Sequence, residues 1–303
     1  NIVWQVSKEI QMESKSLNLF LIDGTPTGRV KCGMLNWTGV AYRIPRTELE
    51  ACSTSGGDIV KHLKQSGVYF LMGYNDATEK ETVYVGQAVT RKNGEGILCR
   101  LLEHKRSNGD KERYADYWNE VIAFTTTNDA FGPTELSYLE NRFSNLAKEA
   151  KRFEVSNGNE PNIGHVTEEK KSELEEFIDY AKIVMGVLGN KVFVPLVEPI
   201  VDEKSIFLGT GKSYDAKGTL TDEGFVVLKG SKIGDLVPSA KGTTIEKNRE
   251  KNFSNISNGV TTTDILFSSP SSAAEFITGC SKNGNKFWKT KDGKLLEEYL
   301  DKD

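Results

Sequence analysis

Cysteine and long apolar runs are scarce in this 303-residue sequence. Its four cysteines, Cys32, Cys52, Cys99 and Cys280, are far apart and form no C-x-x-C pair. Reduced thiols are therefore favoured over disulfides or a zinc site. No apolar stretch approaches the roughly 20 residues of a membrane helix, and the opening NIVWQVSKEI does not resemble a secretory signal. We expect a cytoplasmic protein without a membrane partner.

Basic residues are slightly outnumbered by acidic ones, 39 against 43. The formal net charge is −4, which counts against a uniformly basic surface of the kind that binds nucleic acid. The charge is unevenly distributed, however, because the segment from Thr90 to Arg113 contains seven Lys or Arg residues and only four Asp or Glu residues. A chain that is acidic overall can still present one basic cleft.

The length predicts more than one domain, and the pattern of short strands and helices predicts the α+β class. Residues 1–62 carry β-like runs around the turn-rich DGTPTG, which indicates an N-terminal β-rich lobe. Residues 63–165 mix strand and helix patterns. We interpret the charged helix within 166–195 as a connector, and 196–303 as a C-terminal α+β domain.

The central segment begins with GVYFLMGYNDATEKETVYVGQA, two predicted strands near 67–73 and 82–88 that each carry Tyr and Gly. GEGILCRLLEHKRS predicts a helix, YWNEVIAFTTT a third strand, and GPTELSYLENRFSNLAKEA a long helix that begins at Pro133. Farther along, SSPSSAAEFITG predicts a helix that begins at Ser269 or Ser271 and ends at Gly279.

Several polar side chains accompany these elements. Arg100 and His104 are four residues apart, so one helix face presents both. A guanidinium can hold a phosphate bidentately, and an imidazole can move or orient a proton. Glu140 lies at the border of the apolar stripe of its helix, where a carboxylate can serve as an Mg²⁺ ligand. Glu135 lies in the first turn, where the helix dipole alone favours an acid.

These residues resemble the GIY-YIG endonuclease family over about residues 66–160. The elements that carry the resemblance are, in chain order, G-V-Y ending at Tyr69, Y-V-G beginning at Tyr84, R-x-x-x-H at Arg100 and His104, the Glu of YLENRF at Glu140, and an Asn of FEVSNGNEP at Asn157, with Asn159 and Asn162 as alternatives.

The resemblance implies a small nuclease domain with an antiparallel three-stranded sheet flanked by helices. It implies that Tyr84 activates the attacking water, that Tyr69 contributes a hydrogen bond near that water, and that Arg100 binds the phosphate. His104 and Asn157 join the implied catalytic set, and Glu140 is the implied ligand of Mg²⁺ or Mn²⁺. The implied reaction cleaves nucleic acid, DNA favoured, to 5′-phosphate and 3′-hydroxyl ends.

Other interpretations remain open. Taken alone, the two tyrosines favour cross-strand packing in a sheet, and only the other motif residues favour the catalytic interpretation. A cluster of Arg91, Lys92, Lys105 and Arg106 would fit a phosphate backbone, although each is by itself an ordinary surface charge. A second hypothesis is a weakly catalytic or silent reader of nucleic acid, including modified DNA, which acts through the C-terminal domain. The oligomeric state stays open.

Two tryptophans have similar alternatives. Trp37, with Arg29, Arg43 and Arg46, fits either a stacking and phosphate surface or a buried core position. Trp288 stands among lysines in the C-terminal domain, and strand alternation predicts that it points inward.

Overall fold

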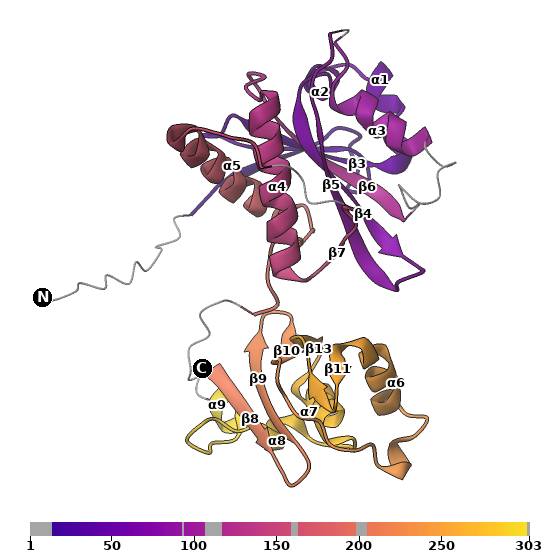
Figure 1. Cartoon of the computed structure of the whole chain (residues 1–303), viewed down its shortest axis with the longest axis vertical. Helices are drawn as coiled ribbons and strands as arrows, with labels where there is room; N and C mark the ends of the chain where they lie inside the picture. Colours follow the sequence, from indigo (N-terminus) through magenta and orange to yellow (C-terminus); the bar gives the residue numbers. More distant parts are fainter. Residues whose placement is uncertain (1–13, 93, 107–116, 159–162, 198–204, 302–303) are drawn as a thin grey trace, which may run out of the picture. The chain divides into compact units, whose positions relative to one another are not determined.

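The computed structural model describes residues 14–92, 94–106, 117–158, 163–197 and 205–301. The chain divides into two compact units, Asn1–Val194 and Pro195–Asp303 (Figure 1). Both mix helices and strands, so the α+β class is confirmed. Within the described ranges, no helix combines the length and the apolarity needed to cross a membrane.

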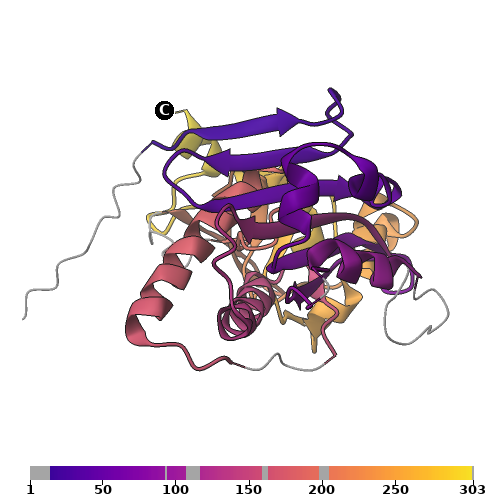
Figure 2. The same ribbon diagram turned by 90° about the horizontal axis from the view of Figure 1, so that it is seen from above.

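A seven-stranded sheet forms the centre of the first unit, with the strand order β1-β2-β3-β6-β4-β5-β7. Its strands are β1 (Leu17–Leu21), β2 (Val30–Met34), β3 (Gly39–Pro45), β4 (Gly67–Asn75), β5 (Lys80–Ala88), β6 (Trp118–Thr126) and β7 (Glu154–Val155). All neighbouring pairs are antiparallel except β5 with β7. The three predicted central strands are β4, β5 and β6, which lie side by side. Strand β1, indigo in Figure 2, lies at one edge of the sheet.

The predicted division at residue 62 does not separate two compact units. Strand β3 pairs with β6 along its whole length, from Gly39 with Thr126 to Pro45 with Glu120. The expected N-terminal lobe therefore continues the sheet of the central segment. The sequence patterns indicate strands there, but the partner of β3 lies more than seventy residues later, and no local pattern specifies such a pairing.

Helices cover both faces of this sheet (Figure 1). On one face, α1 (Ala51–Thr54), α2 (Asp58–Leu63) and α3 (Ile97–Arg106) share a core with Tyr69 and Leu71 of β4. On the other, α4 (Pro133–Ala150) and α5 (Glu168–Val187) share a core with Phe70 and Met72. Successive residues of β4 thus alternate between the two cores, as strand geometry requires.

Helix α5 is a core element, which corrects its interpretation as a connector. Its side chains at Leu174, Phe177 and Val184 are buried in the same cluster as α4. Trp37 lies against it, with ring centroids 5.1 Å apart from Phe177. The charges of this helix lie outside its apolar stripe, so its high charge content concealed a buried face.

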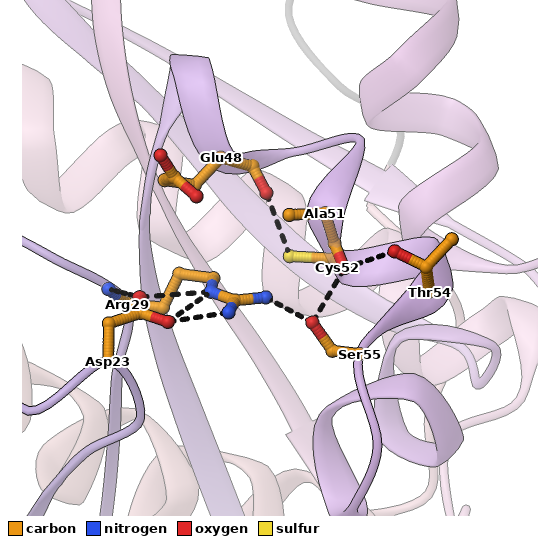
Figure 3. Close-up of polar contacts among 7 residues, drawn as sticks. All are labelled: Asp23, Arg29, Glu48, Ala51, Cys52, Thr54 and Ser55. Carbon is orange, nitrogen blue, oxygen red and sulfur yellow. Dashed lines mark hydrogen bonds and ion pairs between the residues drawn. The ribbon is translucent and has the colours of Figure 1, made fainter.

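A partly buried ion pair between Arg29 and Asp23 fixes the turn between β1 and β2 (Figure 3). Arg29 donates from Nε to Asp23 Oδ2 at 3.0 Å and from Nη1 to Ser55 Oγ, which follows α1. Hydrogen bonding to Arg29 lowers the pKa of Asp23 to about 2. Arg29 is therefore a structural residue of this turn, and Trp37 packs into the core rather than forming a stacking surface with it.

The second unit contains a four-stranded antiparallel sheet in the order β13-β10-β9-β8 and a small pair, β11-β12. Its elements are β8 (Ile206–Thr210), β9 (Asp215–Thr221), β10 (Gly224–Val227), α6 (Thr244–Lys251), β11 (Ile256–Ser257), β12 (Val260–Thr261), β13 (Ile265–Phe267), α7 (Pro270–Thr278), α8 (Gly284–Phe287) and α9 (Leu296–Leu300).

Two predictions for this unit are confirmed. Helix α7 has Ser269 as N-cap, whose side chain accepts from Ser272 N at 3.2 Å, and it ends at Gly279 with a left-handed φ of 72°. Trp288 is fully buried, and its Nε1 donates to Pro270 O at 3.0 Å. The residues around Trp288 form α8 and isolated bridges, however, instead of the expected strand.

Candidate active site

The hairpin of β4 and β5 places both tyrosines on one face of the sheet. Tyr69 is paired with Gly86, and Leu71 with Tyr84. Directly opposite residues share a face, and so do residues two apart on a strand. The tyrosine ring centroids lie 6.4 Å apart. This is the face that α3 covers.

Gly86 provides the space that the Tyr69 ring occupies. A Cβ atom at residue 86 would lie 2.5 Å from Cζ and from the hydroxyl oxygen of Tyr69. Any side chain there would displace the phenol. The spacing of Tyr84 and Gly86 therefore has a packing reason, since one residue contributes a ring and the other makes room for the ring across the hairpin.

Helix α3 brings His104 against both phenols. The Tyr69 hydroxyl and His104 Nε2 share a hydrogen bond of 2.7 Å. The His104 ring centroid lies 5.5 Å from that of Tyr69 and 5.4 Å from that of Tyr84. Burial, reinforced by the charge of Arg100, lowers the pKa of His104 to about 4. The imidazole is therefore neutral near pH 7.

The two phenols have different environments. Tyr69 is 1% exposed, and burial raises its pKa well above 10, with a smaller contribution from Tyr84 and partial compensation by Arg100. Tyr69 thus stays protonated and holds His104. Tyr84 is only partly buried, so it is the phenol that solvent can reach.

Arg100 lies one helical turn before His104 and influences the whole group. Its Nη1 donates to Glu103 Oε2 at 2.9 Å. Its positive charge lowers the pKa of Tyr69, His104 and Glu140, against the larger effect of burial on the tyrosine and the glutamate. The interaction between two charges weakens with distance, so Glu140 lies close enough to Arg100 of α3 for its pKa to be affected.

Glu140 approaches from α4, on the opposite face of the sheet. Gln87 Nε2, near the end of β5, donates to Glu140 Oε2 at 2.9 Å. Burial raises the pKa of Glu140, and the Gln87 hydrogen bond and Arg100 offset part of that rise. Sequence reasoning left Gln87 unassigned. Gln87 directly follows the Y-V-G element in the sequence, and this position is the feature that indicates a side chain near the site.

Glu135, the competing carboxylate, lies elsewhere. It borders a cavity with Lys170 and Glu173 of α5, and its charge acts on Lys170. Neither Tyr69 nor Tyr84 lines that cavity. This placement supports the structural interpretation of Glu135 and leaves Glu140 as the acid near the phenols.

The donor set at Glu140 fits a magnesium ion held by a single carboxylate. Among the described residues, no three His, Cys, Asp or Glu side chains gather to form a cage for an ion. Mg²⁺ commonly takes one or two protein carboxylates and keeps several waters. A half-buried carboxylate with a raised pKa gains from a nearby cation, because burial disfavours its charged form.

Asn157 has a structural position that differs from its implied catalytic role. Its Oδ1 accepts from Val85 N at 3.0 Å, and its Nδ2 donates to Val85 O at 2.7 Å. The side-chain amide therefore continues the ladder that β7 begins on β5. These hydrogen bonds show that Asn157 supports β5, and its catalytic role stays a prediction of the resemblance. The alternatives, Asn159 and Asn162, lie outside the described residues.

Asn157→Ala is expected to destabilise the first unit by about 1–3 kcal/mol, because two backbone groups of Val85 lose their partner. Cleavage per folded molecule should fall much less than in a Glu140 variant. Urea denaturation, with activity measured well below the transition, separates the two effects. A complete loss of activity at unchanged stability would support the catalytic role instead.

The four residues predicted to contact a phosphate backbone differ in their surroundings. Arg91 pairs with Glu103 at 2.7 Å, and Lys105 pairs with Glu50 and donates to Arg46 O at 3.0 Å. Lys92 and Arg106 are exposed. Exposed ion pairs contribute little, so a phosphate can compete for their cations. The cluster is thus partly neutralised by its own surface acids.

The pKa of His104 makes stability depend on pH. The unfolded chain takes up a proton near pH 6.5, whereas the folded state does so only near pH 4. Stability from this group is complete above about pH 6.5 and is lost as the pH falls toward 4, by roughly 2–3 kcal/mol. Urea denaturation between pH 7 and 4.5 measures the slope. His104→Gln should flatten it, and an unchanged slope would contradict the assignment.

Comparison with known proteins gives one match. Residues 207–300 match a family model described as "Domain of unknown function (DUF4357)". This segment lies within the second compact unit. No curated protein and no solved structure matches the chain. The C-terminal unit is thus similar to that family over residues 207–300, and the nuclease resemblance of the first unit depends on its motif residues and their geometry.

Proposed function

We propose that the first unit is a divalent-metal-dependent endonuclease of the GIY-YIG type, which hydrolyses phosphodiesters, DNA favoured. The observation that supports it most is the convergence of the motif residues. Tyr69, Tyr84 and His104 are in mutual ring contact, and the charge of Arg100 acts on Glu140 across the end of β5. Simple sheet packing would not require a carboxylate and a guanidinium there.

In this proposal Tyr84 orients the attacking water and, in its ionised form, accepts its proton. A nearby cation favours the ionised form of a phenol. Arg100 binds the nonbridging oxygens of the scissile phosphate and balances the charge that develops on them. Tyr69 and neutral His104 form the buried pair against which Tyr84 packs.

The reaction balances without a further reactant. The water oxygen bonds to phosphorus, the bond from phosphorus to the 3′ oxygen breaks, and that oxygen takes up a proton to give a 3′-hydroxyl and a 5′-phosphate. A magnesium or manganese ion held by Glu140 would supply Lewis-acid stabilisation of the leaving oxygen.

A second candidate, nucleic-acid reading by the C-terminal unit, has one supporting observation. Lys217 of β9 is paired with Leu208 of β8, and Leu208 forms a bridge with Lys289 on its other side. Both lysines are exposed, and paired residues share a face. This sheet face therefore presents ammonium groups of the kind that contact phosphates.

A substrate panel separates the two candidates. Plasmid, single-stranded DNA, methylated DNA and RNA are incubated with the full chain in Mg²⁺ or Mn²⁺ and then with chelator. The endonuclease predicts metal-dependent products that carry 5′-phosphates, together with loss of cutting in Arg100→Ala. Binding that Lys289→Gln weakens, with no cutting of any substrate, would overturn the endonuclease in favour of the reader.

A further inference from the structure

A second cavity opens on the sheet face that carries the tyrosines. Its volume is about 690 Å³, within the roughly 300–1,000 Å³ typical of small-molecule sites. Strands β1, β2 and β3 form its floor, and the segment from Gly56 to Ile59 forms a wall. None of Tyr69, Tyr84, Arg100, His104 or Glu140 lines it.

One row of paired residues links the cavity to the candidate active site. The row runs across the sheet through Phe20, Lys31, Tyr42, Ala123, Tyr69 and Gly86. Paired residues share a face, so the floor of the cavity and the Tyr69 phenol point to the same side. Four strand spacings of about 4.8 Å separate β2 from β5, which gives roughly 19 Å.

The lining combines an aromatic ring with charged and amide groups. Phe20 is 61% exposed, an unusual state for a large apolar ring beside a cavity. Lys31 Nζ lies 2.6 Å from Asp58 Oδ2, and Asn18 lies in the next row of the floor. This set offers a stacking surface, a cation, and hydrogen-bond donors and acceptors.

Glycine keeps the cavity open. A Cβ at Gly33, on the floor, would meet no atom within 4 Å. The same holds at Gly56 and Gly57 on the wall. A larger side chain at residue 33 would therefore fill the cavity without displacing the fold, and its β-branched form would suit the strand.

We propose that this cavity receives one nucleotide of the substrate strand, with its base on Phe20 and its phosphate at Lys31. The inference rests on the proposed function and adds a second contact to it. Every nucleobase has a face for aromatic stacking, and amide and carboxylate groups read base edges. At about 3.4 Å per stacked nucleotide, roughly 19 Å corresponds to five or six nucleotides from the scissile phosphate.

The test uses ¹⁵N-labelled full chain and two probes, deoxynucleoside monophosphates and a single-stranded octanucleotide, the latter in a Glu140→Gln background that prevents cutting. Both probes should shift the resonances of Phe20, Lys31 and Gly33. Gly33→Val and Phe20→Ala should each weaken octanucleotide binding at least fivefold, with unchanged thermal unfolding. Gly186→Val is the control, since it adds the same side chain at an open position of α5.

The outcomes separate this inference from the proposed function. Cleavage by the unmodified chain, together with octanucleotide affinity that Gly33→Val leaves unchanged, overturns the cavity site alone. Shifts with mononucleotides but not with the octanucleotide overturn the strand contact in favour of a free-nucleotide site. Cavity shifts with both probes, in a chain that cuts no substrate, support the site while the endonuclease fails.

Discussion

Glu140→Gln is expected to reduce metal-dependent cleavage by about 10³-fold while leaving the fold intact. Gln retains the shape of Glu and can still contact Gln87 Nε2 through its carbonyl oxygen. It removes the negative charge that a magnesium ion needs. Burial disfavours that charge, so a cation bound at this carboxylate would stabilise it.

Glu135→Gln is the matched control, because it makes the same change five residues earlier on the same helix. Its charge acts on Lys170, and it lines a cavity that includes neither Tyr69 nor Tyr84. Single-turnover cleavage of a labelled duplex measures both variants at equal protein concentration. If Glu135→Gln loses activity and Glu140→Gln keeps it, the metal assignment is wrong.

Gly86→Ala is expected to destabilise the first unit by about 2–3 kcal/mol and to reduce activity strongly. The added methyl group would lie 2.5 Å from the Tyr69 ring, so the phenol must move and its hydrogen bond with His104 must lengthen or break. The substitution thus disturbs both the packing of the Tyr69 ring and its hydrogen bond with His104, without removing a polar group.

Urea denaturation measures the stability effect, and the His104 imidazole resonances report the lost hydrogen bond. Gly158→Ala serves as the control, since a Cβ there meets no atom within 4 Å and the residue is exposed. An unchanged midpoint together with an unchanged His104 titration in Gly86→Ala would contradict the close approach of Tyr69 to residue 86.

Local elements of the fold were predictable from the sequence. The hairpin of β4 and β5, helix α4 from Pro133 and the ends of α7 follow from apolar periodicity and capping residues. The pairing of β3 with β6 was not predictable, because it joins residues far apart in the chain. The burial of α5 was missed because its charged residues dominate its composition.

The candidate site, too, could be predicted only in part from the sequence. The order of the motif residues placed Tyr69, Tyr84, Arg100, His104 and Glu140 together on resemblance alone. Sequence could not indicate that Asn157 pairs with the backbone of Val85, since an amide serves a strand edge or a ligand equally well. It also could not indicate that burial would keep His104 neutral and Tyr69 protonated.

Titration with Mn²⁺ tests the central claim most directly, because it requires no substrate. The paramagnetic ion broadens the NMR resonances of nearby groups in the isotope-labelled chain. We predict broadening centred on Glu140, Gln87 and Tyr84, and its loss in Glu140→Gln. Broadening that persists in that variant, or that is centred on Glu135 and Glu173, would contradict a metal-dependent site at the end of β5.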